Sequence, residues 1–459
     1  MRKLIGSKEF YRKLFAVALP IMLQNGISNF VNLLDNIMVG RLGTEQMSGV
    51  SIVNQLVFIF FLCIFGAIGG IGIFTAQYAG QKNNEGIQFT FRFKLILGVI
   101  ILVMFSAIFL LKGTDLISLY LHEGSEEGDL AATLMYAKDY LLVILIGLIP
   151  AVVEQVYSST LRECGETVVP MVASIIAVFV NLIFNYILIF GHFGAPAMGV
   201  VGAAVATNIS RFLQVGIVVV YVHATSKKHT YINGMYKSFT VPFDLIKKMM
   251  YMATPLIFNE TLWAAGVAAQ TQIYSVRGLA VVAGLNINST INNVFNIAFI
   301  AMGDAVAIIV GQLLGAGKMD EAKDTAYKII AFSSVMCIGI GTVLFLFAPI
   351  FPLIYNTSDE VRNIASGIIK CSAVLMPLYG FLHATYFTIR SGGKTLITFL
   401  FDSVFLWVVS VPVAFILINK TGMSIFVAFF IVEITNLIKC IIGWLIMKSG
   451  VWVQNIVND

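Results

Sequence analysis

Carboxylates inside long apolar runs are the side chains of this sequence best suited to bind an ion or a polar ligand. Asp35 stands late in the first run, with Asn32 and Ser28 three and seven residues before it on the same helical face. Glu260 stands in the seventh run, five residues after Pro255, which removes a backbone donor and can bend a helix. If these runs cross a membrane, each charge costs at least about 2.5–3.5 kcal/mol on insertion scales. Both acids are therefore functional candidates; the alternatives are an interfacial acid at Asp35 and a structurally paired acid at Glu260.

Amides supply a second set of polar groups within apolar runs. Asn181 and Asn185 are four residues apart and share one helical face. Beside a carboxylate, their oxygens would suit a hard cation such as Na⁺, and hydrogen bonding between helices is the equally open alternative. A further polar stripe at helical spacing comprises Asn286, Ser289, Asn293 and Asn296. We expect this stripe to face a cavity rather than another helix.

Other polar residues in the apolar runs are weaker or different candidates. Asp402, Glu433 and Glu154 are weaker candidates for function, and Arg211 and Lys439 are expected to tie helices together. We expect a substrate cavity lined by Asn29, Asn32, Asn259, Trp263, Asn286, Asn293 and His383.

The composition indicates that most of the chain is surrounded by lipid rather than water. The 459 residues are 58% hydrophobic and only 12% charged, whereas soluble domains carry about 25% charged residues. Such a chain cannot cover itself with polar surface, so lipid must cover most of it. The alternating ten-residue segments of a membrane β-barrel are absent, as are clusters of Lys and Arg with interleaved aromatics. The chain therefore reads as a helical membrane protein without a nucleic-acid partner.

Twelve apolar segments follow one another along the chain. They span residues 14–38, 49–79, 93–119, 133–160, 170–190, 199–222, 249–274, 284–314, 328–354, 364–388, 396–418 and 424–447. An even number of spans places both termini on one side. Twenty of the 29 Lys and Arg residues then fall in segments on that side, against seven on the other. Because Lys and Arg concentrate in cytoplasmic loops, we expect both termini to be cytoplasmic.

The two halves of the sequence repeat at a nearly constant offset, first 235 and later 228 residues. The aligned pairs include Pro20 with Pro255, Gly49 with Gly284, Arg162 with Arg390 and Arg211 with Lys439. Each half has six segments and begins on the same side, as parallel repeats about an axis along the membrane normal do. We predict an all-α membrane protein of twelve transmembrane helices in two six-helix lobes related by pseudo-two-fold symmetry. The N-lobe is residues 1–225, a cytoplasmic linker is 226–248 and the C-lobe is 249–459.

Several short motifs recur together in one known family. They are Leu19-Pro20, Asp35-Asn-Ile-Met-Val-Gly40, Gln77-Tyr-Ala-Gly80, Asn181-x-x-x-Asn185, Gly202-Ala-Ala-Val-Ala-Thr207, and Pro255 with Glu260. As a set they resemble the multidrug and toxic-compound extrusion (MATE) family, over essentially the whole chain. The resemblance implies a V-shaped, two-lobed exporter that exchanges H⁺ or Na⁺ for cationic or aromatic drugs.

The same resemblance implies roles for particular residues. Asp35 corresponds to the ion-coupling acid of the N-lobe, with Asn181, Asn185 and Thr207 around it, and Glu260 corresponds to the acid of the C-lobe. With sodium coupling, Asp35, Asn181 and Asn185 would bind the Na⁺ ion.

This chain also departs from the family pattern at two places. Some branches carry Asp where this chain has Asn185, and others carry an Asp in the tenth span, where only Tyr379 and His383 lie nearby. The first departure argues against a two-carboxylate proton mechanism in the N-lobe. The second leaves the C-lobe without the span-10 carboxylate that those branches have at this place.

From these features we expect a monomeric, multi-pass antiporter of the cell (inner or plasma) membrane. It would export small drug-like molecules with Na⁺ or H⁺ as the coupling ion and no other cofactor. The alternative is a flippase for lipid-linked precursors of the same superfamily, which would be expected to have a more cationic cavity. An intramembrane enzyme is not expected, because the HExxH and GxSxG motifs are absent.

Overall fold

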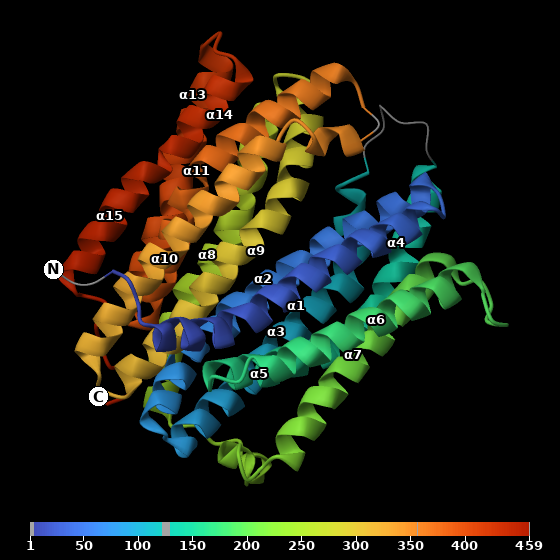
Figure 1. The fold of residues 1–459 in the computed structure, drawn as a ribbon. Helices are drawn as coiled ribbons and strands as arrows, with labels where there is room; N and C mark the ends of the chain where they lie inside the picture. The colour runs from blue at the N-terminus through green and yellow to red at the C-terminus, as the bar shows by residue number, and fades with distance from the viewer. Residues whose placement is uncertain (1–3, 122–128, 356, 459) are drawn as a thin grey trace. The chain divides into compact units, whose positions relative to one another are not determined.

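The computed structural model describes residues 4–121, 129–355 and 357–458, and the regular structure within these ranges is entirely helical (Figure 1). The first half contains α1 (Lys8–Gly40), α2 (Thr44–Gln81), α3 (Asn84–Ser118), α4 (Leu130–Ile144), η1 (Leu145–Gly147), α5 (Leu148–Glu163), α6 (Val168–Phe190) and α7 (Gly199–Ala224). Two short turns follow, η2 (Thr230–Ile232) and η3 (Met235–Lys237). The second half contains α8 (Phe243–Ser275), α9 (Leu279–Gly315), α10 (Met319–Phe347), η4 (Phe351–Ile354), α11 (Asp359–Ser391), α12 (Thr395–Phe399), η5 (Leu400–Val404), η6 (Leu406–Ser410), α13 (Val411–Lys420), α14 (Ile425–Ile434) and α15 (Asn436–Ser449).

Apolar length identifies most of these helices as membrane spans. Within the described ranges, eleven helical stretches are long and apolar enough to cross a membrane, counting α4–α5, α12–α13 and α14–α15 as one stretch each. The twelfth long helix, α8, has 33 residues, but Asn259, Glu260 and Gln270 interrupt its apolar sequence. The prediction of an all-α membrane protein with twelve long helices in two repeated halves is confirmed, although α8 is not among the eleven stretches that are apolar enough to span.

Two predicted spans are helical but not regular. The predicted span 133–160 contains the 3₁₀ turn η1 just before Pro150, and the predicted span 396–418 contains the π-helical turns η5 and η6 before Pro412. A proline inside a helix lacks an N–H group and its ring clashes with the carbonyl four residues earlier. Local 3₁₀ and π turns change the hydrogen-bond register and accommodate both defects.

The bounds of the helices show the repeat directly. The first helices of the two halves, α1 and α8, both have 33 residues, start 235 positions apart and contain a proline at the same place. The starts of α2 and α9, and of α3 and α10, are also 235 positions apart. The ends of α5 and α11 are 228 positions apart, which matches the second offset found in the sequence.

The chain divides into two compact units. Unit 1 comprises residues 1–22, 76–82 and 251–459, and unit 2 comprises residues 23–75 and 83–250. The predicted linker 226–248 packs with unit 2. The beginning of α1 and the end of α2 belong to unit 1, although most of both helices belongs to unit 2.

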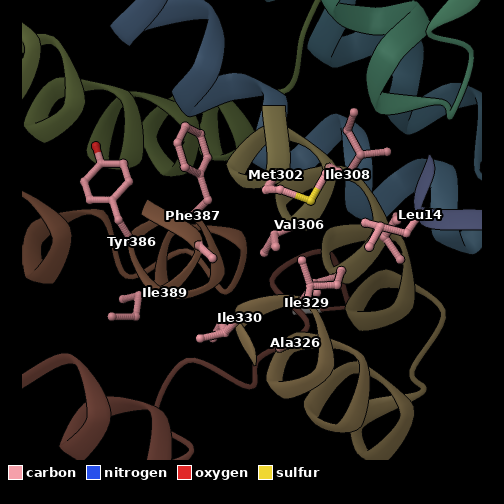
Figure 2. Packing of buried hydrophobic residues seen from close by; sticks show 14 of the residues in the cluster. Leu14, Met302, Val306, Ile308, Ala326, Ile329, Ile330, Tyr386, Phe387 and Ile389 are labelled. Carbon is pink, nitrogen blue, oxygen red and sulfur yellow. The ribbon is translucent and has the colours of Figure 1, made fainter. Parts of the chain in front are cut away.

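Unit 1 has an apolar core formed by α1, α9, α10 and α11. Leu14, Met302, Val306 and Ile329 are among its buried side chains and point toward one another in Figure 2. Because lipid is as apolar as these side chains, burial here provides close packing rather than a hydrophobic driving force.

Glycines allow α2 and α9 to cross closely in unit 1. A Cβ atom at Gly80 would collide with the carbonyl oxygen of Gln312, and one at Gly315 with that of Gln77. Gly80 and Gly315 are related by the 235-residue repeat. Gln77, fully buried, donates to the carbonyl of Ser391 at 3.0 Å and to that of Gln454 at 3.1 Å. The crossing thereby joins α2, α9, the end of α11 and the C-terminal segment.

In unit 2, an acid between α5 and α6 holds the segment after α7. Glu166 forms an ion pair with Lys228 at 2.6 Å, accepts a hydrogen bond from Tyr221 at 2.6 Å and lies 3.4 Å from His229 Nε2. Burial raises the pKa of Glu166, but the hydrogen bonds and charge of these partners outweigh it and leave the pKa below its ordinary value. The carboxylate is therefore stabilised in its ionised form.

Candidate functional site

Unit 2 places the carboxylate of Asp35 against two amides of α6. Asn185 Nδ2 donates to Asp35 Oδ1 at 2.7 Å and also lies 3.2 Å from Oδ1 of Asn181. The amide of Asn181 is 3.3 Å from the hydroxyl of Thr207 on α7. Three helices thus bring together the four residues predicted for the N-lobe ion site.

Local sequence explains this arrangement. Asn181 and Asn185 lie one turn apart on the inner face of α6 and are only 6% and 1% exposed. Near the start of α7, a Cβ atom at Gly202 would lie 2.5 Å from the carbonyl oxygen of Leu188 on α6. Glycine at this place lets α7 approach α6 and brings Thr207 to the amides. Oδ1 of Asn185 is buried without a hydrogen-bond partner, so it is available to a ligand.

The amide of Asn181 can face Asp35 in two ways. With its nitrogen toward Asp35, it donates to the carboxylate oxygens at 2.8 and 3.0 Å, and its oxygen accepts from Thr207 at 3.3 Å. With its oxygen toward Asp35, it accepts from Asn185 and sets an oxygen against the carboxylate. Two oxygens at this separation attract only when a proton or a metal cation lies between them. The orientation with the nitrogen toward Asp35 gives both amide atoms a partner and matches an ionised carboxylate.

Unit 1 contains a second polar cluster inside the helices. Asn259 Nδ2 of α8 lies 3.2 Å from the hydroxyl of Tyr386 and 3.3 Å from Asp402 Oδ2, and Ser403 donates to Asn259 Oδ1 at 2.8 Å. Lys439 of α15 forms an ion pair with Asp402 at 2.9 Å. Asp402 and Ser403 both belong to the π turn η5, a distortion that occurs frequently at functional sites.

The predicted C-lobe acid, Glu260, lies next to this cluster. Its charged neighbours are Arg390 and Asp402, so two acids and two bases come together when Lys439 is included. Lys439 ties α15 to η5, as the sequence predicted. The position of Asp402 beside Glu260 was not predicted. The pairing of Asp402 with Lys439 did have a signal in the sequence, because an Asp and a Lys stand in adjacent apolar segments.

The remaining predicted cavity residues are distributed differently. Five of them are exposed within their own units: Asn29 and Asn32 in unit 2, and Trp263, Asn286 and Asn293 in unit 1. Asn259 is buried in the polar cluster, and the ring of His383 lies 5.0 Å from Phe299 and 5.5 Å from Phe387. His383 therefore has aromatic neighbours and, as charged neighbours, Asp402 and Lys439 of the polar cluster. A role of these residues in substrate binding stays a prediction.

Repeated halves of long apolar helices, each with charged and amide groups buried inside the helices, define a polytopic membrane protein of the transporter class. The MatE family model matches residues 20–187 and again 255–416, once in each half and over most of the chain. The chain belongs to this family, the multidrug and toxic-compound extrusion (MATE) family of membrane efflux transporters.

Related proteins and solved structures agree with this assignment. A probable multidrug resistance protein NorM of Thermotoga maritima is 24% identical over 456 residues, which cover 97% of this chain and 93% of the relative. Multidrug resistance protein MdtK of Pectobacterium atrosepticum is 27% identical over 369 residues, 79% of this chain and 78% of the relative. A MATE crystal structure in complex with MaL6 has the same fold, with a TM-score of 0.85 at 20% identity over 98% of this chain and 97% of that one. An outward-facing multidrug resistance MATE transporter gives a TM-score of 0.84 at 20% identity, with the same coverage.

Proposed function

We propose that the chain is a cation-coupled antiporter that exports small, cationic or aromatic drug-like molecules by alternating access. The observation that carries the proposal is the cluster of Asp35 with Asn181, Asn185 and Thr207, in which two amides and a hydroxyl surround one carboxylate. The relatives named as multidrug resistance proteins support drugs as the exported molecules.

The incoming ion, H⁺ or Na⁺, binds at Asp35. A proton on this carboxyl is shared with the amide oxygen of Asn181, whereas Na⁺ is ligated by the carboxylate and by oxygens of Asn181, Asn185 and Thr207. Hard cations prefer such oxygen ligands. One elementary charge that crosses the membrane potential yields about 2.3 kcal/mol per 100 mV, a factor of about 50 in a two-state equilibrium. This energy shifts the transporter between its outward- and inward-open states.

Unit 1 recognises the exported cation in this mechanism. Glu260 attracts the positive group of the substrate, while the Asp402–Lys439 pair stays neutral as a unit beside it. Trp263 follows Glu260 by about one helical turn on α8 and is exposed within unit 1, so its ring is available to an aromatic or cationic substrate. Asn286 and Asn293 of α9 are exposed in the same unit and are the further residues proposed to contact the substrate there.

The distribution of Lys and Arg supports a multi-pass protein of the cell membrane with both termini in the cytoplasm. In this orientation the Glu166–Lys228 ion pair lies on the cytoplasmic side. The repeated halves would supply two lobes within one chain, so we propose that the monomer transports on its own.

Reconstituted proteoliposomes test the proposal. Sodium and pH gradients are imposed separately while uphill movement of the fluorescent aromatic cation ethidium is followed. We expect one gradient to drive ethidium, Asp35→Asn to abolish the movement at normal yield, and the control Asp115→Asn, an exposed acid of unit 2, to retain it. Ethidium movement that needs neither gradient, or that survives in Asp35→Asn, would overturn the proposal. Scrambling of a fluorescent polyprenyl-linked lipid without ethidium transport would favour the flippase.

A further inference from the structure

The repeat gives Arg211 of α7 an internal comparison. Its repeat-related residue, Lys439, is 9% exposed and is neutralised by Asp402 at 2.9 Å. No ion pair of the described residues involves Arg211. Its guanidinium lies 5.3 Å above the ring of Phe61, and its Nη1 is buried without a hydrogen-bond partner. The same position of the repeat thus carries a paired cation in unit 1 and an unpaired one in unit 2.

The acid is missing from unit 2 because the sequence differs at the related position. Shifting Asp402 back by 228 residues gives Ser174, a buried neutral side chain of α6. Unit 2 instead has a cavity of about 200 Å³ that Arg211 helps to line. The other lining residues are Phe61, Ala151, Glu154, Gln155 and Gln214.

The charges on the cavity walls restrict what it can hold. Glu154 of α5 accepts a hydrogen bond from Ser158 at 2.5 Å, with Gln214 of α7 as a second hydrogen-bonding partner and Arg162 as the charged neighbour on its own helix. Arg211 and Glu154 line one cavity without forming an ion pair. A simple anion on Arg211 would be repelled by Glu154, and a simple cation on Glu154 would be repelled by Arg211.

A ligand that carries both a negative and a positive group can form an ion pair with Arg211 and another with Glu154. Arg211 is partly buried, but its Nη1 is enclosed without a hydrogen-bond partner. An enclosed charged group without a partner is destabilising, so a carboxylate on the ligand would stabilise this nitrogen as Asp402 stabilises Lys439. A dry cavity of about 150 Å³ accommodates benzene, and this one is larger and polar. We propose that this cavity binds a compact zwitterion of amino-acid size, with its carboxylate on Arg211 and its ammonium group on Glu154.

Binding is measured by calorimetry on the purified full chain in lipid nanodiscs, without any transport step. The probes are the zwitterions glycine, leucine and phenylalanine, together with leucine methyl ester, which lacks the carboxylate, and N-acetylleucine, which lacks the ammonium group. We expect saturable binding of at least one zwitterion. If that ligand is leucine, both blocked forms should bind at least tenfold more weakly; for another ligand, its own methyl ester and N-acetyl form serve. No binding by any of the three zwitterions, or equal affinity for a blocked form, would overturn the proposal.

Variants test whether Arg211 and Glu154 bind the zwitterion. Arg211→Met and Glu154→Gln should each raise the Kd for the bound zwitterion at least tenfold, and the exposed-arginine control Arg41→Met should leave the Kd unchanged. An unchanged Kd in either cavity variant would contradict the assignment. The comparison of blocked and free ligands uses the unaltered chain, so it decides the question even if a variant does not fold. Because it measures binding alone, the result is independent of whether the chain proves to be a cation-coupled exporter.

Discussion

The buried ion pair of Lys439 with Asp402 gives the sharpest quantitative prediction. The charged groups are 2.9 Å apart, and the side chains are only 11% and 24% exposed. At this separation and an effective dielectric constant of about 20, Coulomb's law gives about 6 kcal/mol of attraction. Desolvation of both groups offsets much of this energy, so the pair contributes little net stability although each partner depends strongly on the other.

Removing one partner should therefore be costly and removing both should not. Lys439→Met leaves Asp402 buried and charged, which should lower the free energy of unfolding by about 3–5 kcal/mol. Asp402→Asn leaves Lys439 unpaired at a similar cost. The double variant should recover most of the loss, with a coupling energy of at least about 2 kcal/mol.

Reversible unfolding in mixed micelles measures the cycle. Lys112 and Asp115 are a control pair at 3.1 Å, with side chains 70% and 69% exposed, and should couple by less than about 1 kcal/mol. A coupling energy below about 0.5 kcal/mol for Lys439 and Asp402 would mean that the two sites are additive. That result would refute the neutral cluster proposed beside Glu260.

Three further perturbations probe other parts of the structure. Gly315→Ala should lower the free energy of unfolding by about 1–3 kcal/mol, because a Cβ there collides with the backbone of Gln77; Gly339→Ala, in open space, should not lower it, and equal losses would contradict the close crossing. In the parent, ionised Glu166 stabilises the fold above its ordinary pKa of 4.5, because its pKa is lowered in the folded state. This stabilisation is lost as pH falls through the folded-state pKa, and Glu166→Gln removes it at every pH. Its melting temperature should lie below that of the parent above pH 4.5, with the gap closing on acidification; a gap independent of pH would contradict the ion pair. Asn185→Leu removes the donor to Asp35 and should reduce cation-driven efflux at least about tenfold; efflux within a factor of two of the parent would refute its role.

The sequence predicted the helices and the repeat because both follow from patterns along the chain. The length of the apolar segments predicts the helices, and the matching positions of Pro20 and Pro255 predict the repeat, without any knowledge of how the helices pack. The π turns η5 and η6 were not predicted, because the register of hydrogen bonds before Pro412 depends on the helices around it. The prediction also treated 249–274 as a span like the others, although Asn259, Glu260 and Gln270 interrupt the apolar sequence of α8.

The candidate site was predictable where it depends on spacing within one helix. Asn181 and Asn185 share a face of α6 by their four-residue spacing, and the family resemblance linked them to Asp35. The pairing of Asp402 with Lys439 depends on how three helices meet, which no periodicity along one helix reveals. The unpaired Arg211 became significant only when the structure showed what surrounds its repeat-related partner.

The central claim is that a coupling ion bound at Asp35 is exchanged for a substrate bound in unit 1, and direct ion release tests it. Ethidium is added to the detergent-solubilised protein, and protons released are measured with a pH indicator and sodium released with radioactive Na⁺. We predict that the parent chain releases one of these ions on binding ethidium, and that Asp35→Asn releases neither while still binding ethidium through unit 1. Equal ion release from the parent and from Asp35→Asn would contradict the account.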